Sequence, residues 1–363
     1  RLAAWIGLAL LAWMNVIQWN RDYGSVTETA TPAAATTAGG AETGAANQGQ
    51  LPSVPTGDAA SDTAPATGAM APAPAAGQAA PSQPSVRVVT DVLDMDISLQ
   101  GGDLLRADLV KYPRDKKAGS LPVRLFTTQE PDYHVARSGL RVLNGRAEPT
   151  HLAVYTSAAN EYRMAPGAQE LRVPITWTDG QGVTVTKTYV FKPGRYDLQV
   201  IYDVDNRSDS AWSGASYVQI ARHVYTPERS MFDVESYAYR GPAIYDGKSY
   251  EKLDVTDEEE GQFAQNVTGG WIASMQHHFV SAAVPPAGEE YNFTLGKDGS
   301  HALLTYRGPL KSVPAGTTGR FSETLFVGPK LQAQLETVVP RLELTADYGK
   351  LTILSQPLFW LLE

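Results

Sequence analysis

The side chains with the widest chemical repertoire in this sequence are its six histidines, because imidazole binds transition metals and moves protons near neutral pH. His277 and His278 are adjacent in a run that predicts a strand, where neighbouring side chains point to opposite faces and do not easily share one ion. The other four histidines are scattered along the chain: His134, His151, His223 and His301. We predict no metal site, although the sequence leaves open that the fold assembles one from distant residues.

Carboxylates are the second candidates, since two acids in different surroundings can divide proton donation and proton abstraction between them. Asp233 with Glu235, or Glu323 with a histidine, has the residue types of a sugar epimerase's acid/base pair. Carboxylates that alternate along a strand more often face water, however. The sequence has no nucleophile elbow, phosphate loop, dinucleotide fingerprint or zinc-binding helix. We therefore predict that the chain is not an enzyme, with no catalytic residue and no cofactor.

A binding cleft without catalysis is the third candidate. Its lining would be the aromatic residues Tyr237, Tyr239 and Trp271, and the alternative is that these rings pack in the core. Residues 237–260 contain turn residues and end in four consecutive acids, which predicts a loop with a solvated acidic surface.

Composition excludes several partners. The 363 residues carry a net charge of −9 and contain no cluster of four or more Lys and Arg, which argues against nucleic acid and against a polybasic membrane patch. No cysteine is present, so the chain has neither a disulfide nor a thiolate metal site, as suits an exported protein that folds without oxidation.

Residues 1–20 predict a transmembrane anchor. Within residues 2–19 the strongly polar side chains are Asn15 and Gln18, and about 18 residues suffice to span a bilayer. A cleaved signal peptide is the alternative, but bulky and charged residues follow where small ones would be needed. Because the chain begins with Arg1, we expect a few residues before it. The anchor residues are Trp5, Leu8, Leu11, Trp13 and Trp19.

Residues 21–85 predict a disordered linker. The segment 24–85 is rich in Ala, Thr, Pro and Gly, and its few larger apolar residues cannot offset the entropy lost on ordering. A flexible chain of this length has a root-mean-square reach of about 40–50 Å. A folded domain at its end could therefore move sideways from its anchor.

Residues 86–346 change to an alternation of apolar and polar side chains, which is typical of half-buried strands. Gly and Pro punctuate the strands and no helices separate them, so we predict a mainly β fold: a large antiparallel β-sandwich with a short helix over 330–339. The predicted strands cover residues 93–99, 105–109, 171–177, 183–188, 196–204, 271–284, 291–295, 301–306 and 321–327.

Residues 347–363 predict an amphipathic helix that lies along a membrane interface. The apolar run 351–362 is too short to span a bilayer, which needs roughly 20 residues, and Pro357 kinks or restarts the helix. A terminal helix packed in the core is the alternative. The residues of the interfacial helix are Leu351, Leu354, Pro357, Leu358, Phe359, Trp360 and Leu361, with Trp360 at headgroup depth.

Four blocks of sequence resemble, in order, bacterial members of the YidC/Oxa/Alb family of membrane-protein insertases. The resemblance covers nearly all of the chain, and residues 24–85 match in composition only. The blocks are Thr-Asp-Val-Leu-Asp at 90–94 with Gly-Gly-Asp at 101–103, Gly-Gly-Trp-Ile-Ala-Ser-Met-Gln at 269–276, Leu-Phe-Val-Gly-Pro-Lys at 325–330, and Leu-Thr-Ala-Asp-Tyr-Gly at 344–349 with Ile-Leu-Ser-Gln-Pro-Leu-Phe at 353–359.

The resemblance implies a protein of the bacterial inner membrane whose main domain, akin to the galactose-mutarotase fold, lies in the periplasm. It implies an insertase or chaperone for membrane proteins, working alone or with the Sec translocon, with the insertion groove outside this chain. The implied partners are the lipid bilayer, nascent membrane proteins, and the Sec translocon with its SecDF accessory complex, docked through residues 206–252. From the residues alone, a membrane-tethered carbohydrate-binding or epimerase-like periplasmic domain remains the alternative.

Overall fold

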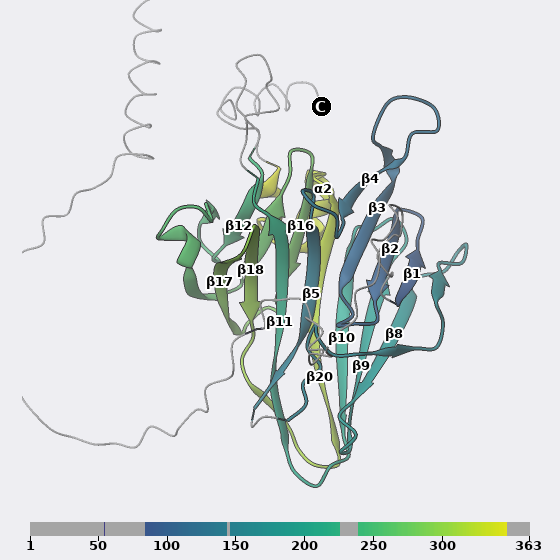
Figure 1. Cartoon of the computed structure of the whole chain (residues 1–363), viewed down its shortest axis with the longest axis vertical. Helices are drawn as coiled ribbons and strands as arrows, with labels where there is room; N and C mark the ends of the chain where they lie inside the picture. The colour runs from purple at the N-terminus through teal and green to yellow at the C-terminus, as the bar shows by residue number, and fades with distance from the viewer. Residues whose placement is uncertain (1–53, 55–83, 144–145, 226–238, 347–363) are drawn as a thin grey trace, which may run out of the picture. The chain divides into compact units, whose positions relative to one another are not determined.

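Strands supply most of the regular structure in this computed structural model (Figure 1). The structure describes residues 54, 84–143, 146–225 and 239–346. The strands run from Ser85 to Pro329 and belong to one compact unit of the chain. The predicted anchor, most of the linker and the predicted interfacial helix lie outside the described residues.

The larger sheet has eleven strands, and the pairing of its neighbours is antiparallel except between β1 and β7. β19 (Lys311–Val313) pairs with β11, and β4 (Pro122–Phe126) pairs with β3. The other nine follow the order β14 (Ala264–Thr268), β17 (Glu290–Asp298), β18 (His301–Arg307), β11 (Trp212–His223), β5 (His134–Val142), β3 (Leu104–Pro113), β2 (Leu93–Ser98), β1 (Ser85–Val89) and β7 (Glu161–Arg163).

The smaller sheet has nine strands and is antiparallel throughout. Its longest strand, β20 (Thr317–Pro329), pairs with β10 along ten residues, from Asn206 opposite Thr317 to Asp197 opposite Phe326. The order is β13 (Tyr250–Lys252), β12 (Gly241–Tyr245), β15 (Trp271–Met275), β16 (Phe279–Val284), β20, β10 (Asp197–Asn206), β9 (Val183–Phe191), β8 (Leu171–Thr178) and β6 (Thr156–Ser157).

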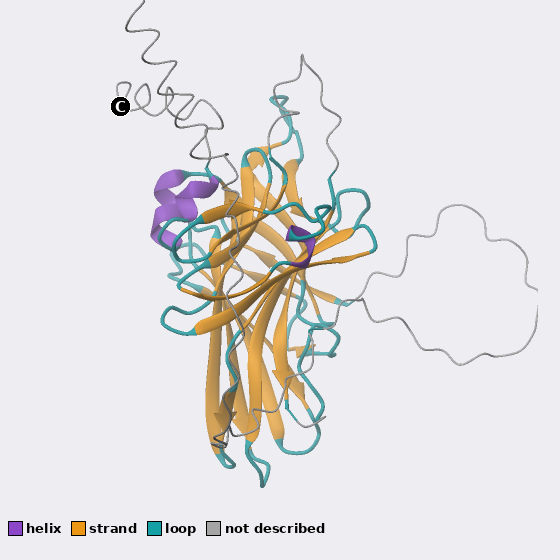
Figure 2. Cartoon of the chain, turned by 90° about the vertical axis from the view of Figure 1, so that its left-hand side faces the viewer, coloured by secondary structure: helices purple, strands orange, loops and turns teal. Residues whose placement is uncertain are grey.

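Helices are short in the described residues, and Figure 2 draws them in purple beside the strands. They are the 3-10 turns η2 (Glu260–Gln262) and η3 (Leu342–Thr345) and the α-helix α2 (Gln332–Val338), which packs Leu335 into the core. α2 lies where the sequence predicts a helix. No helix in the described part of the chain is long and apolar enough to cross a membrane.

The predicted fold class, a large antiparallel β-sandwich, is confirmed. The strands predicted by alternation are present, but the run 271–284 is a hairpin of two strands rather than one. Residues 241–252, predicted as loop, also form the hairpin β12–β13. Alternation missed β5 and β11, because all nine residues of β5 and nine of the twelve residues of β11 are buried, whichever face they occupy.

One hydrophobic cluster joins the inner faces of the two sheets. It contains residues of both sheets, such as Trp212 and Phe126 from the larger sheet and Trp271 and Phe326 from the smaller one, all at most 1% exposed. At about 25 cal/mol per Å² of apolar surface removed from water, this cluster is the main favourable term in folding.

A buried lysine ties the two sheets together across this core. Lys187 of β9 is fully buried, and its Nζ donates to the carbonyl oxygens of Gly101 (2.9 Å), Gly102 (3.2 Å) and Ser138 (2.9 Å), all in the larger sheet or its β2–β3 turn. Burial lowers the pKa of Lys187 to about 7. Gly102 is required here, since its φ is +67° and a Cβ would lie 2.9 Å from this Nζ.

Three further polar contacts cross the core. Tyr306 of β18 donates to Glu323 Oε2 of β20 at 2.6 Å, and the Arg222 guanidinium of β11 donates to the Met275 carbonyl of β15 at 2.6 Å.

The third contact is made by His134 of β5, which is bonded through Nδ1 to the Leu125 carbonyl and through Nε2 to the Ser281 hydroxyl of β16, both at 2.9 Å. Because a carbonyl only accepts, Nδ1 carries the proton and Nε2 accepts from Ser281.

Glu323 gives the fold a testable pH dependence. Burial raises its pKa to about 7, so between roughly pH 4.5 and 7 the folded chain holds a proton that the unfolded chain releases. Stability is therefore lost as the pH rises through this window. We predict that Glu323→Gln, which keeps an acceptor for Tyr306, removes about 3 kcal/mol of that loss, measured as the free energy of urea unfolding at pH 4.5 to 8.

The matched control is Glu258→Gln, which neutralises an exposed carboxylate in the acidic turn and should keep the wild-type dependence on pH. If the free energy of unfolding falls equally with pH in Glu323→Gln and in the wild type, Glu323 is not a buried carboxyl that holds a proton.

Candidate functional site

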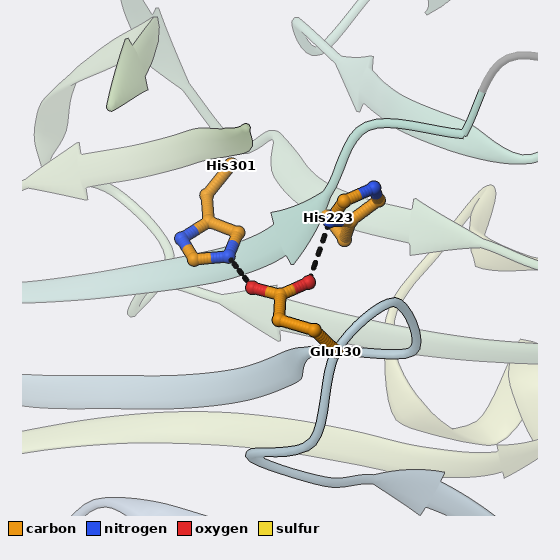
Figure 3. Close-up of side chains that lie close together, drawn as sticks. All are labelled: Glu130, His223 and His301. Carbon is orange, nitrogen blue, oxygen red and sulfur yellow. Dashed lines mark hydrogen bonds and ion pairs between the residues drawn. The ribbon is translucent and has the colours of Figure 1, made fainter. Parts of the chain in front are cut away.

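One group of chemically versatile side chains comes together in the described residues: Glu130, His223 and His301 (Figure 3). Glu130 lies in the loop 127–133 between β4 and β5, His223 ends β11, and His301 begins β18. Because β11 and β18 pair antiparallel, His223 and His301 are opposite each other in the register. Cross-strand partners have Cβ atoms about 5 Å apart, so the pairing itself brings the two imidazoles together.

The Glu130 carboxylate lies between the two imidazoles, with one oxygen directed at each ring (Figure 3). His301 Nε2 donates to Oε1 at 2.5 Å. His223 Nδ1 forms the second contact, 2.6 Å from Oε2, and this nitrogen is shielded from solvent. The hydrogen bond from His301 lowers the pKa of Glu130, so the group is a carboxylate at neutral pH.

The surrounding structure holds these three residues in place. Thr127 and His134 exchange two backbone hydrogen bonds of 2.9 and 2.8 Å, which close the loop that carries Glu130. The same loop is joined to β11, where the His223 amide donates to the Tyr133 carbonyl at 2.9 Å. The Tyr133 ring stacks on the His301 ring with centroids 4.2 Å apart. The site therefore combines two paired strands and one closed loop.

The remaining histidines are in other surroundings. His134 and His151 are buried, and His151 Nδ1 is bonded to the Tyr217 hydroxyl at 2.6 Å. His277 and His278 lie in the turn between β15 and β16 with their rings stacked at 3.9 Å, so the expectation that they sit in a strand and point to opposite faces is wrong. The tight turn overrides the alternation of the flanking strands.

From the sequence, His223 and His301 are two of four scattered histidines, and nothing in it indicates that they lie side by side. Glu130 is not among the residues that the sequence singles out. The two histidines are far apart in the chain, and strand order cannot be read from alternation. Glu130 precedes Pro131 in a turn-rich stretch, which marks it only as a loop residue.

Glu323 does not pair with a histidine. It is 2% exposed and its hydrogen bond is to Tyr306, so the structure provides no acid/base pair at this position. Asp233 and Glu235 lie outside the described residues.

Of the aromatic residues predicted to line a cleft, Trp271 is fully buried, with the Tyr245 and Tyr250 rings each 5.9 Å from it between centroids. Tyr239 is half-buried, and its hydroxyl donates to the carbonyls of Pro242 (2.5 Å) and Leu253 (2.8 Å). Both rings therefore pack against the protein. This is the alternative to a cleft lining that the sequence left open. Tyr237 lies outside the described residues.

A small pocket of about 140 Å³ lies elsewhere, between the strands β20, β17 and β19. Its lining includes Tyr291, Phe321 and the ion pair of Lys311 with Glu289, whose charged atoms are 2.8 Å apart. Pockets that enclose a drug-sized ligand are usually 300–1,000 Å³, so this one suits at most a few atoms.

The described residues of the region 206–252, which was expected to dock a partner, are 206–225 and 239–252, and their strands are divided between sheet interior and sheet edge. β11 lies inside the larger sheet and is largely buried. The hairpin β12–β13 is the edge of the smaller sheet and exposes Lys248, Glu251 and Lys252.

Solved structures similar to this chain include a galactose mutarotase related enzyme from Lactobacillus acidophilus, at a TM-score of 0.44 and 8% identity over 67% of this chain and 97% of that one. A galactose mutarotase-like protein from Lactobacillus casei matches at a TM-score of 0.40 and 10% identity, over 67% of this chain and 99% of the other. Similarities with TM-scores and sequence identities this low say nothing about a ligand or an activity of this chain.

Sequence comparison is more specific. The family model of the YidC periplasmic domain matches residues 85–361. A relative described as membrane protein insertase YidC, from Pseudomonas putida (strain W619), is 37% identical over 98% of this chain and 63% of its own length. Another of the same description, from Methylococcus capsulatus, is 42% identical over 77% of this chain and 51% of its own length.

The chain therefore spans less than two thirds of the length of these relatives. Because the domain model covers most of the chain and the identities extend across it, the chain belongs to the YidC family of membrane protein insertases.

Proposed function

We propose that this chain is part of a YidC-type insertase of the bacterial inner membrane and that its β-sandwich stands in the periplasm. The observation that carries the proposal is the match of the YidC periplasmic domain model to residues 85–361, the range that contains both sheets. The absence of cysteine and the apolar segment 2–19 agree with an exported, membrane-anchored domain.

An insertase of this kind assists membrane segments of nascent proteins into the lipid, alone or beside the Sec translocon. Unpaired polar groups of the client cost several kcal/mol each in hydrocarbon, so the insertase must offer them a hydrated, partly enclosed path. The relatives are longer than this chain, and we assign that path to the part of the longer protein that these residues do not match. This chain would supply anchoring, an interfacial helix and partner docking.

The docking surface that we propose for the SecDF accessory complex is the hairpin β12–β13, an exposed sheet edge among the described residues of the region 206–252. An edge strand carries backbone groups that no neighbouring strand pairs, and partner proteins use such edges. Asp246 fixes the turn by accepting from the amides of Lys248 (2.8 Å) and Ser249 (2.6 Å), so the hairpin presents its charged side chains in a defined position.

The alternative of a tethered carbohydrate-binding or epimerase-like domain finds no support among the described residues. Trp271 packs in the core, Glu323 has Tyr306 rather than a histidine as its partner, and the pocket of about 140 Å³ is small for a sugar.

The interfacial helix is tested in the full-length protein. Leu354→Asp with Leu358→Asp removes two side chains from the predicted apolar face, where each buried leucine contributes about 2 kcal/mol. We predict loss of most complementation when this double variant is the only copy in an insertase-depletion strain, measured as colony yield. The control, Thr352→Asp with Gln356→Asp, adds similar charge to the predicted polar face and should complement. Wild-type growth of the first variant would refute the interfacial role.

The docking surface is tested by photo-crosslinking in cells. A photoreactive residue at Lys248, in the β12–β13 turn, should crosslink to SecD or SecF, whereas one at the exposed Lys117 of the β3–β4 loop should not. Crosslinks from Lys117 alone, or from neither position, would contradict docking through the hairpin.

A further inference from the structure

We propose that Glu130, His223 and His301 form a binding site for a divalent transition-metal ion, with zinc as the ion that best suits them. Two imidazoles and one carboxylate are a ligand set that proteins use for zinc with an open position left for water or another ligand. In the part of the chain that the structure describes, this is the one group of three histidine or acidic residues whose ligand atoms lie within 4.8 Å of one another.

The geometry is close to that of a metal site. Around a tetrahedral zinc ion, ligand atoms bound at about 2.0–2.2 Å lie roughly 3.4 Å apart. Here the carboxylate oxygens are 2.6 Å from His223 Nδ1 and 2.5 Å from His301 Nε2. A metal ion would replace the two close nitrogen–oxygen contacts with nitrogen–metal–oxygen bridges. The ligand atoms would have to move apart by roughly an ångström. Side-chain rotations supply this movement, with no change in the paired strands.

His223 presents one ring nitrogen to the carboxylate. Its Nδ1 is shielded from solvent and lies 2.6 Å from Glu130 Oε2. Coordination would use this nitrogen directly, because a metal ion between the two atoms would take the place of their contact.

The elements around the site limit how far the ligands can move. His223 and His301 are fixed opposite each other by the β11–β18 register, and the amide of the next residue, Val224, donates to the Ser300 carbonyl at 2.8 Å. Stacking of Tyr133 restricts the His301 ring. Such outer contacts orient metal ligands and reduce the entropy lost on binding.

The site is also accessible. The side chains of Glu130, His223 and His301 are 50%, 29% and 24% exposed, so an ion can enter and a water molecule can complete its coordination. The carboxylate offsets part of the ion's charge, which the two neutral imidazoles cannot do.

The other histidines provide the control. His134 and His151 are held in the core by hydrogen bonds. His277 and His278 form a second close pair, but in the residues described no carboxylate joins them to a three-ligand group. A site that depends on the Glu130 geometry should therefore be insensitive to loss of this second pair.

The test is zinc binding to the complete chain, purified in detergent through a tag without histidine and stripped with a chelator. Titration calorimetry with Zn²⁺ should give one ion per chain, and Co²⁺ should give the visible absorption of a low-coordinate site. His223→Ala, His301→Ala and Glu130→Gln should each weaken binding by at least the ~10–100-fold that loss of an outer-sphere partner costs. His277→Ala with His278→Ala should bind as wild type.

Glu130→Gln keeps the shape and an acceptor for the hydrogen bond from His301, and circular dichroism of each variant without metal checks that it is folded. The proposal is overturned if the wild-type chain takes up no Zn²⁺ at micromolar concentrations, since the three residues are then an ion-paired cluster only. It is equally overturned if folded triad variants bind like wild type, or if binding is lost with His277 and His278.

Discussion

The sandwich depends on the burial of two large sheets against each other through one hydrophobic cluster. A polar group buried between the sheets needs a hydrogen-bond partner, because an unpaired polar group there costs several kcal/mol. Lys187 is the clearest example, since its amine donates hydrogen bonds to three carbonyl oxygens that all belong to the opposite sheet or its turn. A slip of one residue in β9 would turn this amine to the outer face, so the lysine fixes register as well as stability.

Strand register also determines the positions of the surface features. His223 and His301 face each other because β11 and β18 pair in one register, and Glu130 reaches them because its loop is bonded to β11. The β12–β13 hairpin projects from the edge of the smaller sheet through its pairing with β15. A folded body of this kind suits docking, since its contact residues are ordered before a partner arrives.

Sequence predicted the parts of this structure that depend on local pattern. β8 and β10 alternate clearly because one face of each is buried and the other is partly exposed. β5 escaped notice because both of its faces are buried, so Arg137 and Ser138 lie inside the fold together with Val135 and Leu140. Lys187 could not be recognised as buried, because its partners are backbone atoms far away in the sequence. The cluster at Glu130 could not be predicted either, because its residues are far apart in the sequence and only the order and pairing of the strands bring them together. The family resemblance, by contrast, was readable in short blocks of sequence and is confirmed by the domain match.

The central claim is that this sandwich is one folded body on the periplasmic side of the inner membrane. Since these residues contain no cysteine, single cysteines report on it directly. The decisive measurement is labelling of spheroplasts with a membrane-impermeant maleimide, for the full-length protein with cysteine at the exposed Lys248 or at the fully buried Ala273 of β15. The account predicts full labelling of Lys248→Cys in intact spheroplasts and labelling of Ala273→Cys only after denaturation. Labelling of Lys248→Cys only after the membrane is broken would contradict the periplasmic location, and ready labelling of Ala273→Cys would contradict the folded core.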